Sequence, residues 1–348
     1  MIDVNELFKD KVILVTGGCG SIGSEIVRQL IDFKPGEIRV LDNSESKQFH
    51  FIQEIKSDIV KPMIGDVRDY KRVKSAIKSV DLVFHAAALK HVPLCEFNCI
   101  EAVNTNVIGT QNVVSASIEE EVERFISIST DKAVHPINTM GATKLLSEKI
   151  VLNASRDYKK PLFCSVRFGN VLESDGSVIP IFEKQIKEGS TVTITSKHMT
   201  RFFMSMSEAV NLVLEAAEKT QGGEIFILNM KSLKIIDLAK TMVEELAPRY
   251  GYDPEKIKIE AIGIRPGEKL HESLFTGEEA PFVEKQGDLF ILKVPEVDIS
   301  SLKGEVIDDK KIVGFNSNNS DHINQEEIKK FFRNREIINN QVVRKSNR

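Results

Sequence analysis

Short apolar runs alternate with stretches of helical hydrophobic period through the first half of the chain. Strands are predicted where apolar residues follow one another without polar alternation, at 12–16, 38–42, 63–65, 82–88, 125–129 and 162–167, and again at 224–228. Helices are predicted at 22–32, 70–77, 106–118, 139–153 and 207–218. Buried strands separated by helices are typical of a parallel sheet with helices on both faces. We therefore predict an α/β fold built on a doubly wound parallel sheet.

The first strand–helix connection, TGGCGSIG, carries a glycine pattern at residues 16–23. Gly17, Gly20 and Gly23 are spaced for a turn in which the backbone approaches a pyrophosphate at a helix N-terminus, and Ser21 and Ile22 complete that turn. The pattern stands between a predicted strand and a predicted helix, which is the context of a dinucleotide-binding Rossmann fold. The alternative is a tight turn that binds nothing.

Asp42 bears on the choice of cofactor, because it ends the next predicted strand about 20 residues after the glycines. A carboxylate there accepts hydrogen bonds from both ribose hydroxyls of NAD and repels the additional phosphate of NADP, so NAD is expected rather than NADP. Asp66 and Val67 are expected to flank the adenine, although Asp66 is also a common turn residue at a strand end. Ala86 and Ala87 are expected beside the cofactor.

Beyond Gly169 the alternation becomes irregular, which indicates a second domain. We expect residues 1–170 and about 207–230 to form the NAD-binding domain. Residues about 171–206 and 231–335 are expected to form a smaller C-terminal substrate-binding α/β domain, with a short helix at 323–332. Residues 336–348 are polar and basic, and we expect them to form a flexible tail.

The bulk properties exclude some classes of function. A formal net charge of −4 gives no global reason to expect a nucleic-acid partner. No apolar stretch approaches the roughly 20 residues of a membrane span, and the N-terminal residues lack the apolar core of a signal peptide. Cys19, Cys95, Cys99 and Cys164 lack zinc-site spacing, so free thiols in a reducing cytoplasm are expected, with a metal or a disulfide as the alternative.

A polar cluster follows the apolar run at 125–129. Thr130, Asp131 and Lys132 come where a parallel sheet opens onto its ligand. Met140 and Lys144 are four residues apart at the start of a predicted helix, so they share one face. A hydroxyl, a carboxylate and two ammonium groups near one another are the groups that acid–base catalysis uses. For Asp131 and Lys132 the alternative is a solvated surface ion pair.

These motifs resemble those of extended short-chain dehydrogenases/reductases that act on nucleotide sugars. The general resemblance lies in TGGCGSIG, FHAAA and NTNVIGTQN. Across about residues 8–280 the chain is similar to the UDP-N-acetylglucosamine 4,6-dehydratases of bacterial surface-polysaccharide biosynthesis, in HAAALKHVPLCE, STDKAVHPINTMGATK, RFGNV, GSVIPIF, TRFFM and IRPGEKLHE. Two features depart from the pattern: Met140 replaces the usual tyrosine of the superfamily, and the loop near Glu173 lacks a glycine.

The resemblance implies a reaction and roles for the polar cluster. Hydride leaves sugar carbon 4, water is eliminated across carbons 5 and 6, and the hydride returns to carbon 6. Thr130 is expected to orient the 4-hydroxyl, Asp131 to protonate the leaving hydroxyl, and Lys132 to take the proton from carbon 5. Lys144 is expected to hold the nicotinamide ribose. Met140 has no proton to give or take and is expected to be a spacer beside the nicotinamide.

The resemblance also implies substrate ligands at the mouths of the strands and in the second domain. The residues expected to contact the UDP-sugar are Lys90, His91, Asn170, Val178, Pro180, Arg201, Arg265 and Glu268. For His91 a plain surface turn is an equal alternative. A homo-oligomer is expected from the relatives, and no metal site is expected. Two rival functions stay open: a nucleotide-sugar 4-epimerase, and a protein that binds a dinucleotide as a sensor without turnover.

Overall fold

The computed structural model of the 348-residue chain describes residues 4–172, 177–294, 314–318 and 320–330. The chain forms two compact units. The first comprises residues 1–175, 204–229 and 273–315, and the second comprises 176–203, 230–272 and 316–348. Residues 273–315 thus belong to the first unit, whereas the sequence pattern groups 231–335 in one domain.

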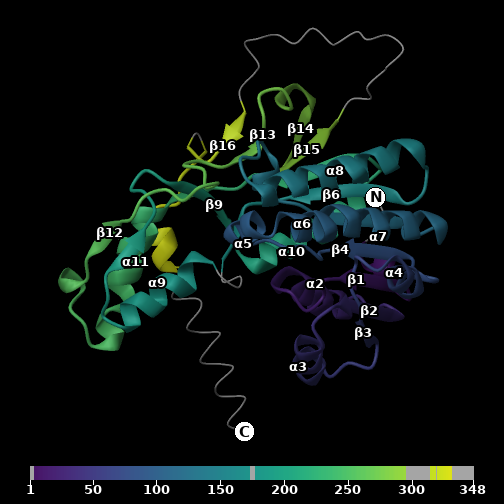
Figure 1. The fold of residues 1–348 in the computed structure, drawn as a ribbon, viewed down its shortest axis with the longest axis horizontal. Helices are drawn as coiled ribbons and strands as arrows, with labels where there is room; N and C mark the ends of the chain where they lie inside the picture. The colour runs from purple at the N-terminus through teal and green to yellow at the C-terminus, as the bar shows by residue number, and fades with distance from the viewer. Residues whose placement is uncertain (1–3, 173–176, 295–313, 319, 331–348) are drawn as a thin grey trace. The chain divides into compact units, whose positions relative to one another are not determined.

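A nine-stranded sheet forms the centre of the first unit (Figure 1). Its strand order is β14-β15-β10-β6-β5-β4-β1-β2-β3, and neighbours from β3 to β10 are parallel. The strands are β1 (Val12–Thr16), β2 (Glu37–Asp42), β3 (Val60–Ile64), β4 (Leu82–His85), β5 (Arg124–Ile128), β6 (Leu162–Arg167), β10 (Glu224–Leu228), β14 (Val283–Gln286) and β15 (Leu289–Lys293). The order 3-2-1-4-5-6 is that of a Rossmann fold, which confirms the predicted doubly wound sheet.

Helices cover both faces of this sheet. One layer contains α2 and α10, and the other contains α4, α7 and α8 (Figure 1). The helices of the first unit are α1 (Val4–Phe8), α2 (Ser21–Asp32), α3 (Glu45–Ile55), α4 (Tyr70–Ile77), α5 (Val92–Phe97), α6 (Cys99–Ala102), α7 (Gly109–Glu119), α8 (Thr139–Asp157) and α10 (Met206–Lys219). Short elements complete it: the 3₁₀ turns η2 (Asp131–Ala133) and η5 (Ala280–Phe282), and the strands β7 (Asn170–Val171) and β13 (Ser273–Phe275).

Two predicted elements differ from those observed. The strand predicted at 82–88 ends at His85, because the chain then turns toward the glycine loop, where Ala87 lies against Gly17. The helix predicted at 106–118 consists of a π-helical segment, η1 (Val103–Ile108), followed by α7. π-Helical segments are rare and frequent at functional sites. The antiparallel strands β14 and β15 are an addition that the sequence pattern does not predict.

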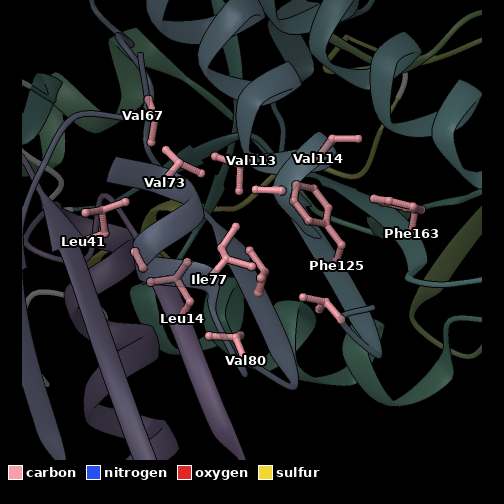
Figure 2. Close-up of a cluster of buried hydrophobic side chains, with 14 of the residues drawn as sticks. Leu14, Leu41, Val67, Val73, Ile77, Val80, Val113, Val114, Phe125 and Phe163 are labelled. Carbon is pink, nitrogen blue, oxygen red and sulfur yellow. The ribbon is translucent and has the colours of Figure 1, made fainter. Parts of the chain in front are cut away.

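A hydrophobic cluster fixes the α4–α7 layer onto the sheet (Figure 2). Leu14 of β1 and Phe125 of β5 are fully buried there. Val73 of α4 and Val113 of α7 are also fully buried and meet these strand residues in the same cluster. Because this packing leaves no freedom to the helices, the carboxyl ends of β1, β4, β5 and β6 are held at one edge.

The second unit is smaller and mixes helices with short strands. Its helices α9 (Val178–Lys187) and α11 (Ile235–Leu246) pack against each other. Strand β8 (Val192–Ile194) pairs in parallel with β12 (Ile259–Ala261), and β9 (Thr200–Met204) pairs antiparallel with β11 (Ser232–Lys234). The remaining elements are η3 (Pro248–Tyr250), η4 (Pro254–Lys256) and β16 (Phe315–Asn316), which lies at the boundary between the units.

Some predictions fall on residues that the structure does not describe. The helix expected at 323–332 begins at 325 and is described as far as 330. The tail at 336–348 and the loop residue Glu173 lie outside the described residues.

Candidate active site

The glycine loop between β1 and α2 is packed backbone against backbone. Gly17 has φ +64°, and a Cβ on it would lie 2.7 Å from the Ala87 nitrogen and Cα. A Cβ on Gly23 would lie 2.3 Å from the Gly17 carbonyl oxygen. Only glycine fits at these positions, so α2 begins at Ser21, directly beside the loop. The uncapped N–H groups of this helix are a fitting site for a pyrophosphate, and the residues of this turn fit NAD.

Asp42 is held in place at the end of β2. Its Oδ2 accepts a hydrogen bond of 3.1 Å from the Cys19 N–H, and its Oδ1 accepts one of 3.0 Å from the Ser44 N–H. The carboxylate is therefore fixed against the glycine loop, where a ribose would be recognised. Burial, together with Asp42, raises the pKa of the Cys19 thiol to about 12. Cys19 is thus a neutral neighbour of the loop.

Asp66 is bound by a residue that the sequence argument does not include. Arg68 donates to both Asp66 oxygens, from Nε at 3.0 Å and from Nη2 at 2.7 Å. The hydrogen bonds from Arg68 outweigh the effect of burial and hold the pKa of Asp66 below its usual range. Val67 is buried in the hydrophobic cluster. An Asp66–Arg68 pair, rather than an isolated carboxylate, therefore borders the expected adenine position.

The polar cluster after β5 forms a 3₁₀ turn. Asp131 has no exposed surface. Its Oδ1 accepts hydrogen bonds of 2.9 Å from the Thr130 hydroxyl and from Lys132 Nζ. Its Oδ2 is buried and finds no hydrogen-bond partner among the described residues. An unsatisfied buried carboxylate oxygen costs free energy, which native proteins tolerate chiefly where a function or a ligand requires it.

Asn170 joins the same group. Lys132 Nζ lies 3.4 Å from the Asn170 Oδ1, and the Asp131 N–H donates to the Phe168 carbonyl at 3.1 Å. The turn is therefore suspended from the chain that follows β6. Thr130, Asp131, Lys132 and Asn170 meet at one edge because β5 and β6 are parallel neighbours.

Lys144 lies on α8 beneath this turn. Its side chain is buried, and Nζ donates a hydrogen bond of 2.6 Å to the Ile128 carbonyl, at the end of β5. Burial lowers the pKa of Lys144 to about 8, against an opposing effect of Glu148. Burial and the charge of Lys144 lower the pKa of His85 to about 3, so His85 is neutral at physiological pH. Lys144 therefore exchanges its proton close to physiological pH.

Met140 contacts a different set of residues from Lys144. It is buried in a small cluster with Cys95 and Ala102, against which Val92 packs. The next residue, Gly141, brings the α8 backbone against the turn, because a Cβ there would lie 2.3 Å from the Lys132 carbonyl oxygen. Met140 thus has a packing role in this structure.

Other expected ligands are distributed over both units. Lys90 and His91 are exposed in the loop that follows β4. In the second unit, Pro180 and Arg265 are exposed, and Val178 and Glu268 are partly exposed. Because the two units are described separately, the structure brings only Asn170 of the expected substrate ligands together with the catalytic turn.

Arg201 is engaged by its own unit. It is buried and donates to the carbonyl oxygens of Thr200 at 2.7 Å, Leu270 at 3.2 Å and Lys269 at 2.8 Å. Its Nη2 also lies 3.6 Å from Glu268 Oε1. The guanidinium therefore anchors the loop that carries Arg265, instead of presenting its donors to solvent.

Sequence reasoning missed a chain of buried polar residues behind the site. His85 bridges the hydroxyls of Thr16 and Thr110, at 2.8 and 2.9 Å. Asn106, in the π-helical segment, donates to Thr143 at 2.9 Å and exchanges hydrogen bonds with Leu89. The motif NTNVIGTQN contained this signal, because a buried asparagine must be hydrogen-bonded. The chain ties β4, η1 and α8 together.

Comparison with known proteins places this site in a family. A model of the family described as polysaccharide biosynthesis protein matches residues 13–294. The chain belongs to this family. The family and the sheet confirm the resemblance to extended short-chain dehydrogenases/reductases.

Three relatives are similar over nearly their whole length. The chain is 52% identical to the uncharacterized membrane protein MJ1061 of Methanocaldococcus jannaschii, over 95% of this chain and 98% of that one. It is 41% identical to a UDP-glucose 4-epimerase of Rickettsia canadensis, over 93% and 95%. The X-ray structure of Pen from Bacillus thuringiensis aligns with a TM-score of 0.86 and 41% identity, over 94% and 98%.

One relative's name raises the question of a membrane span. Within the described parts of this chain, no helix combines the length and the apolar character that crossing a bilayer needs. The described residues also contain no group of three or more histidine, cysteine or acidic side chains placed to hold a metal ion.

Proposed function

We propose that this chain is a UDP-N-acetylglucosamine 4,6-dehydratase that uses NAD and produces a UDP-4-keto-6-deoxy sugar for surface polysaccharides. The observation that carries the proposal is the Thr130–Lys132 turn: a buried carboxylate with one unpartnered oxygen, bound on its other oxygen by a hydroxyl and an amine. Membership of a polysaccharide biosynthesis family supports the assignment to glycans.

NAD, held by the glycine loop and Asp42, would supply the hydride acceptor for sugar carbon 4 and the donor for carbon 6. The residues of the chain do the proton work. Thr130 orients the 4-hydroxyl, and Lys144 holds the nicotinamide ribose and supplies a positive charge nearby. Lys132 takes the proton from carbon 5, which the 4-ketone has acidified, while Asp131 gives a proton to the hydroxyl that leaves carbon 6.

The burial of Asp131 adds a requirement to this scheme. A fully buried carboxylate cannot touch a sugar, so substrate binding must move Lys132 or open the turn before the acid reaches the leaving hydroxyl. Lys132 is the mobile candidate, because 22% of its side chain is exposed. In this scheme the bond between Lys132 and Asp131 breaks on binding, and both groups then face the sugar.

A 4-epimerase is the second candidate, and the name of the Rickettsia canadensis relative favours it. An epimerase must move a proton on and off the 4-hydroxyl. Met140 cannot do this, and its thioether is buried against Cys95. The epimerase reading also gives no work to a base and an acid placed side by side, as Lys132 and Asp131 are.

The experiment that decides is a single incubation read by NMR. The purified full-length protein is given NAD and UDP-N-acetylglucosamine in deuterated water, and UDP-glucose in a parallel sample. A dehydratase produces a methyl group at carbon 6 and solvent deuterium at carbon 5. An epimerase keeps the carbon 6 hydroxyl and inverts carbon 4. If neither sugar is converted while NAD binds, the chain is a dinucleotide-binding sensor and the proposal is wrong.

A further inference from the structure

A buried arginine joins three segments of the first unit. Arg167 ends β6 and has 1% of its surface exposed. It donates to both oxygens of Glu148 on α8, at 2.9 and 2.8 Å, and to both oxygens of Glu279, each at 2.9 Å. It also donates to the Leu274 carbonyl at 3.1 Å. One guanidinium is thus saturated by two carboxylates, which leaves the buried group with one excess negative charge.

This charge lies next to the candidate active site. Glu148 follows Lys144 by four residues, so both side chains lie on the same face of α8. Glu148 Oε1 also accepts a hydrogen bond of 2.5 Å from the hydroxyl of Ser129, which directly precedes Thr130. The Ser129 N–H donates to the Val166 carbonyl of β6 at 2.7 Å. The same cluster therefore contacts the helix of Lys144 and the strand that leads into the catalytic turn.

We propose that Arg167 and Glu148 are positioning residues, which set the charge state of Lys144 and hold the Thr130–Lys132 turn at the end of β6. The inference rests on the proposed function only in making Lys144 part of the active site. Arg167 balances the charge of Glu148, so that Lys144 is attracted by a partly neutralised carboxylate instead of a full one.

Other charged groups face Lys144 less directly. His85 on β4 is neutral at physiological pH. Asp131 and Lys132 on η2, which packs against α8, are paired with each other. Glu96 on α5 accepts a hydrogen bond of 2.6 Å from the Thr139 N–H at the start of α8. Glu148 is accordingly the charge whose removal should act most strongly on Lys144, since it opposes the effect of burial.

The two residues should act on Lys144 with opposite signs. Glu148→Gln removes the negative charge that favours protonated Lys144, so the pKa of Lys144 falls. Arg167→Met leaves Glu148 uncompensated, so the pKa of Lys144 rises. Charges about 6 Å apart near a protein surface interact by a few kcal/mol, and one pKa unit corresponds to about 1.4 kcal/mol, so shifts of about one unit or more are expected. A role confined to packing gives no opposite signs.

The test measures Lys144 itself, without turnover. The full-length protein is labelled at several pH values with a lysine-reactive anhydride, and the Lys144 peptide is quantified by mass spectrometry. At pH 7 we expect Glu148→Gln to label roughly tenfold faster and Arg167→Met roughly tenfold slower, each tenfold corresponding to one pKa unit. The matched control is Asp157→Asn, the same chemical change at an exposed position about 20 Å along α8, where screening leaves Lys144 unaffected.

Arg167→Met leaves two buried carboxylates without a partner and risks unfolding. The double variant Glu148→Gln/Arg167→Met removes both charges, and we expect its Lys144 pKa to lie between those of the single variants. If Glu148→Gln changes the labelling of Lys144 no more than Asp157→Asn does, the proposal is wrong. Labelling that follows the expected signs, without conversion of UDP-N-acetylglucosamine, keeps this proposal and rejects the proposed function.

Discussion

Gly141 is the point where α8 touches the catalytic turn, and replacing it with alanine tests whether that contact fixes the geometry of the site. Asn138 caps the helix by accepting a hydrogen bond of 2.7 Å from the Gly141 N–H. A Cβ on Gly141 would lie 2.3 Å from the Lys132 carbonyl oxygen and 3.2 Å from Asn138 Oδ1. The first of these atoms belongs to the backbone, so no side chain can rotate away to make room.

The size of the effect follows from this distance. Ordinary contact with a Cβ begins near 3.4 Å, so α8 or the turn must move by about 1 Å. Overpacking of this kind costs about 1–3 kcal/mol, which the better helix propensity of alanine offsets by at most about 1 kcal/mol. A displacement of about 1 Å between reacting groups can lower turnover about 100-fold. We therefore expect a small loss of stability and a large loss of rate.

The assay is turnover of saturating UDP-N-acetylglucosamine, with thermal melting as the measure of folding. The control is Ala142→Gly at the next, exposed position of α8, which loses about 1 kcal/mol of helix propensity without touching the turn. It should lower the melting temperature and keep the rate. If Gly141→Ala retains turnover within threefold of the unmodified protein, the contact does not set the geometry of the site.

Three further predictions concern the cofactor, the acid–base residues and stability. Asp42→Ala should weaken the preference for NAD over NADP, as measured by binding of each dinucleotide; equal binding by the unmodified protein would contradict the role of Asp42. Lys132→Ala should lower turnover about 100- to 10,000-fold, because it removes a general base, whereas Met140→Ala should cost far less; similar losses would refute the assignment. Burial acts to raise the pKa of Glu279, but Arg167 outweighs it and holds that pKa below its usual range. Glu279→Gln should therefore destabilise the protein by about 2 kcal/mol at neutral pH, and the difference in melting temperature should shrink as pH falls below about 4.5, since the wild-type carboxylate is then protonated as well; a difference independent of pH would oppose this.

The parallel part of the sheet is predictable because both of its faces are buried. Its strands are continuous apolar runs, and those predicted at 12–16, 162–167 and 224–228 have the observed bounds. The edge strand β14 has no such signal, since Glu284, Lys285 and Gln286 are exposed and its pairing with β15 is antiparallel. A strand that covers no core leaves no apolar pattern in the sequence.

The candidate site is predictable as far as its residues follow the ends of strands. Thr130, Asp131 and Lys132 could be expected near Asn170, because neighbouring parallel strands end at one edge. The contacts of Arg167 could not, since it ends an apolar strand and its partner Glu279 lies far away in the sequence. The site residues of the second unit are predicted from motifs alone, and their contact with the sugar stays a prediction.

The interleaved order of segments has a consequence for biosynthesis. Strand β6 is almost entirely buried, yet its neighbour β10 follows only about 60 residues later, after a segment of the second unit has been made. At about 5–20 residues per second, the ribosome leaves β6 as an unpaired apolar edge for about 3–12 s. Such an edge is a template for pairing with another nascent chain. The yield of folded protein should therefore depend on translation speed between residues 168 and 224, and on chaperones that bind extended apolar segments.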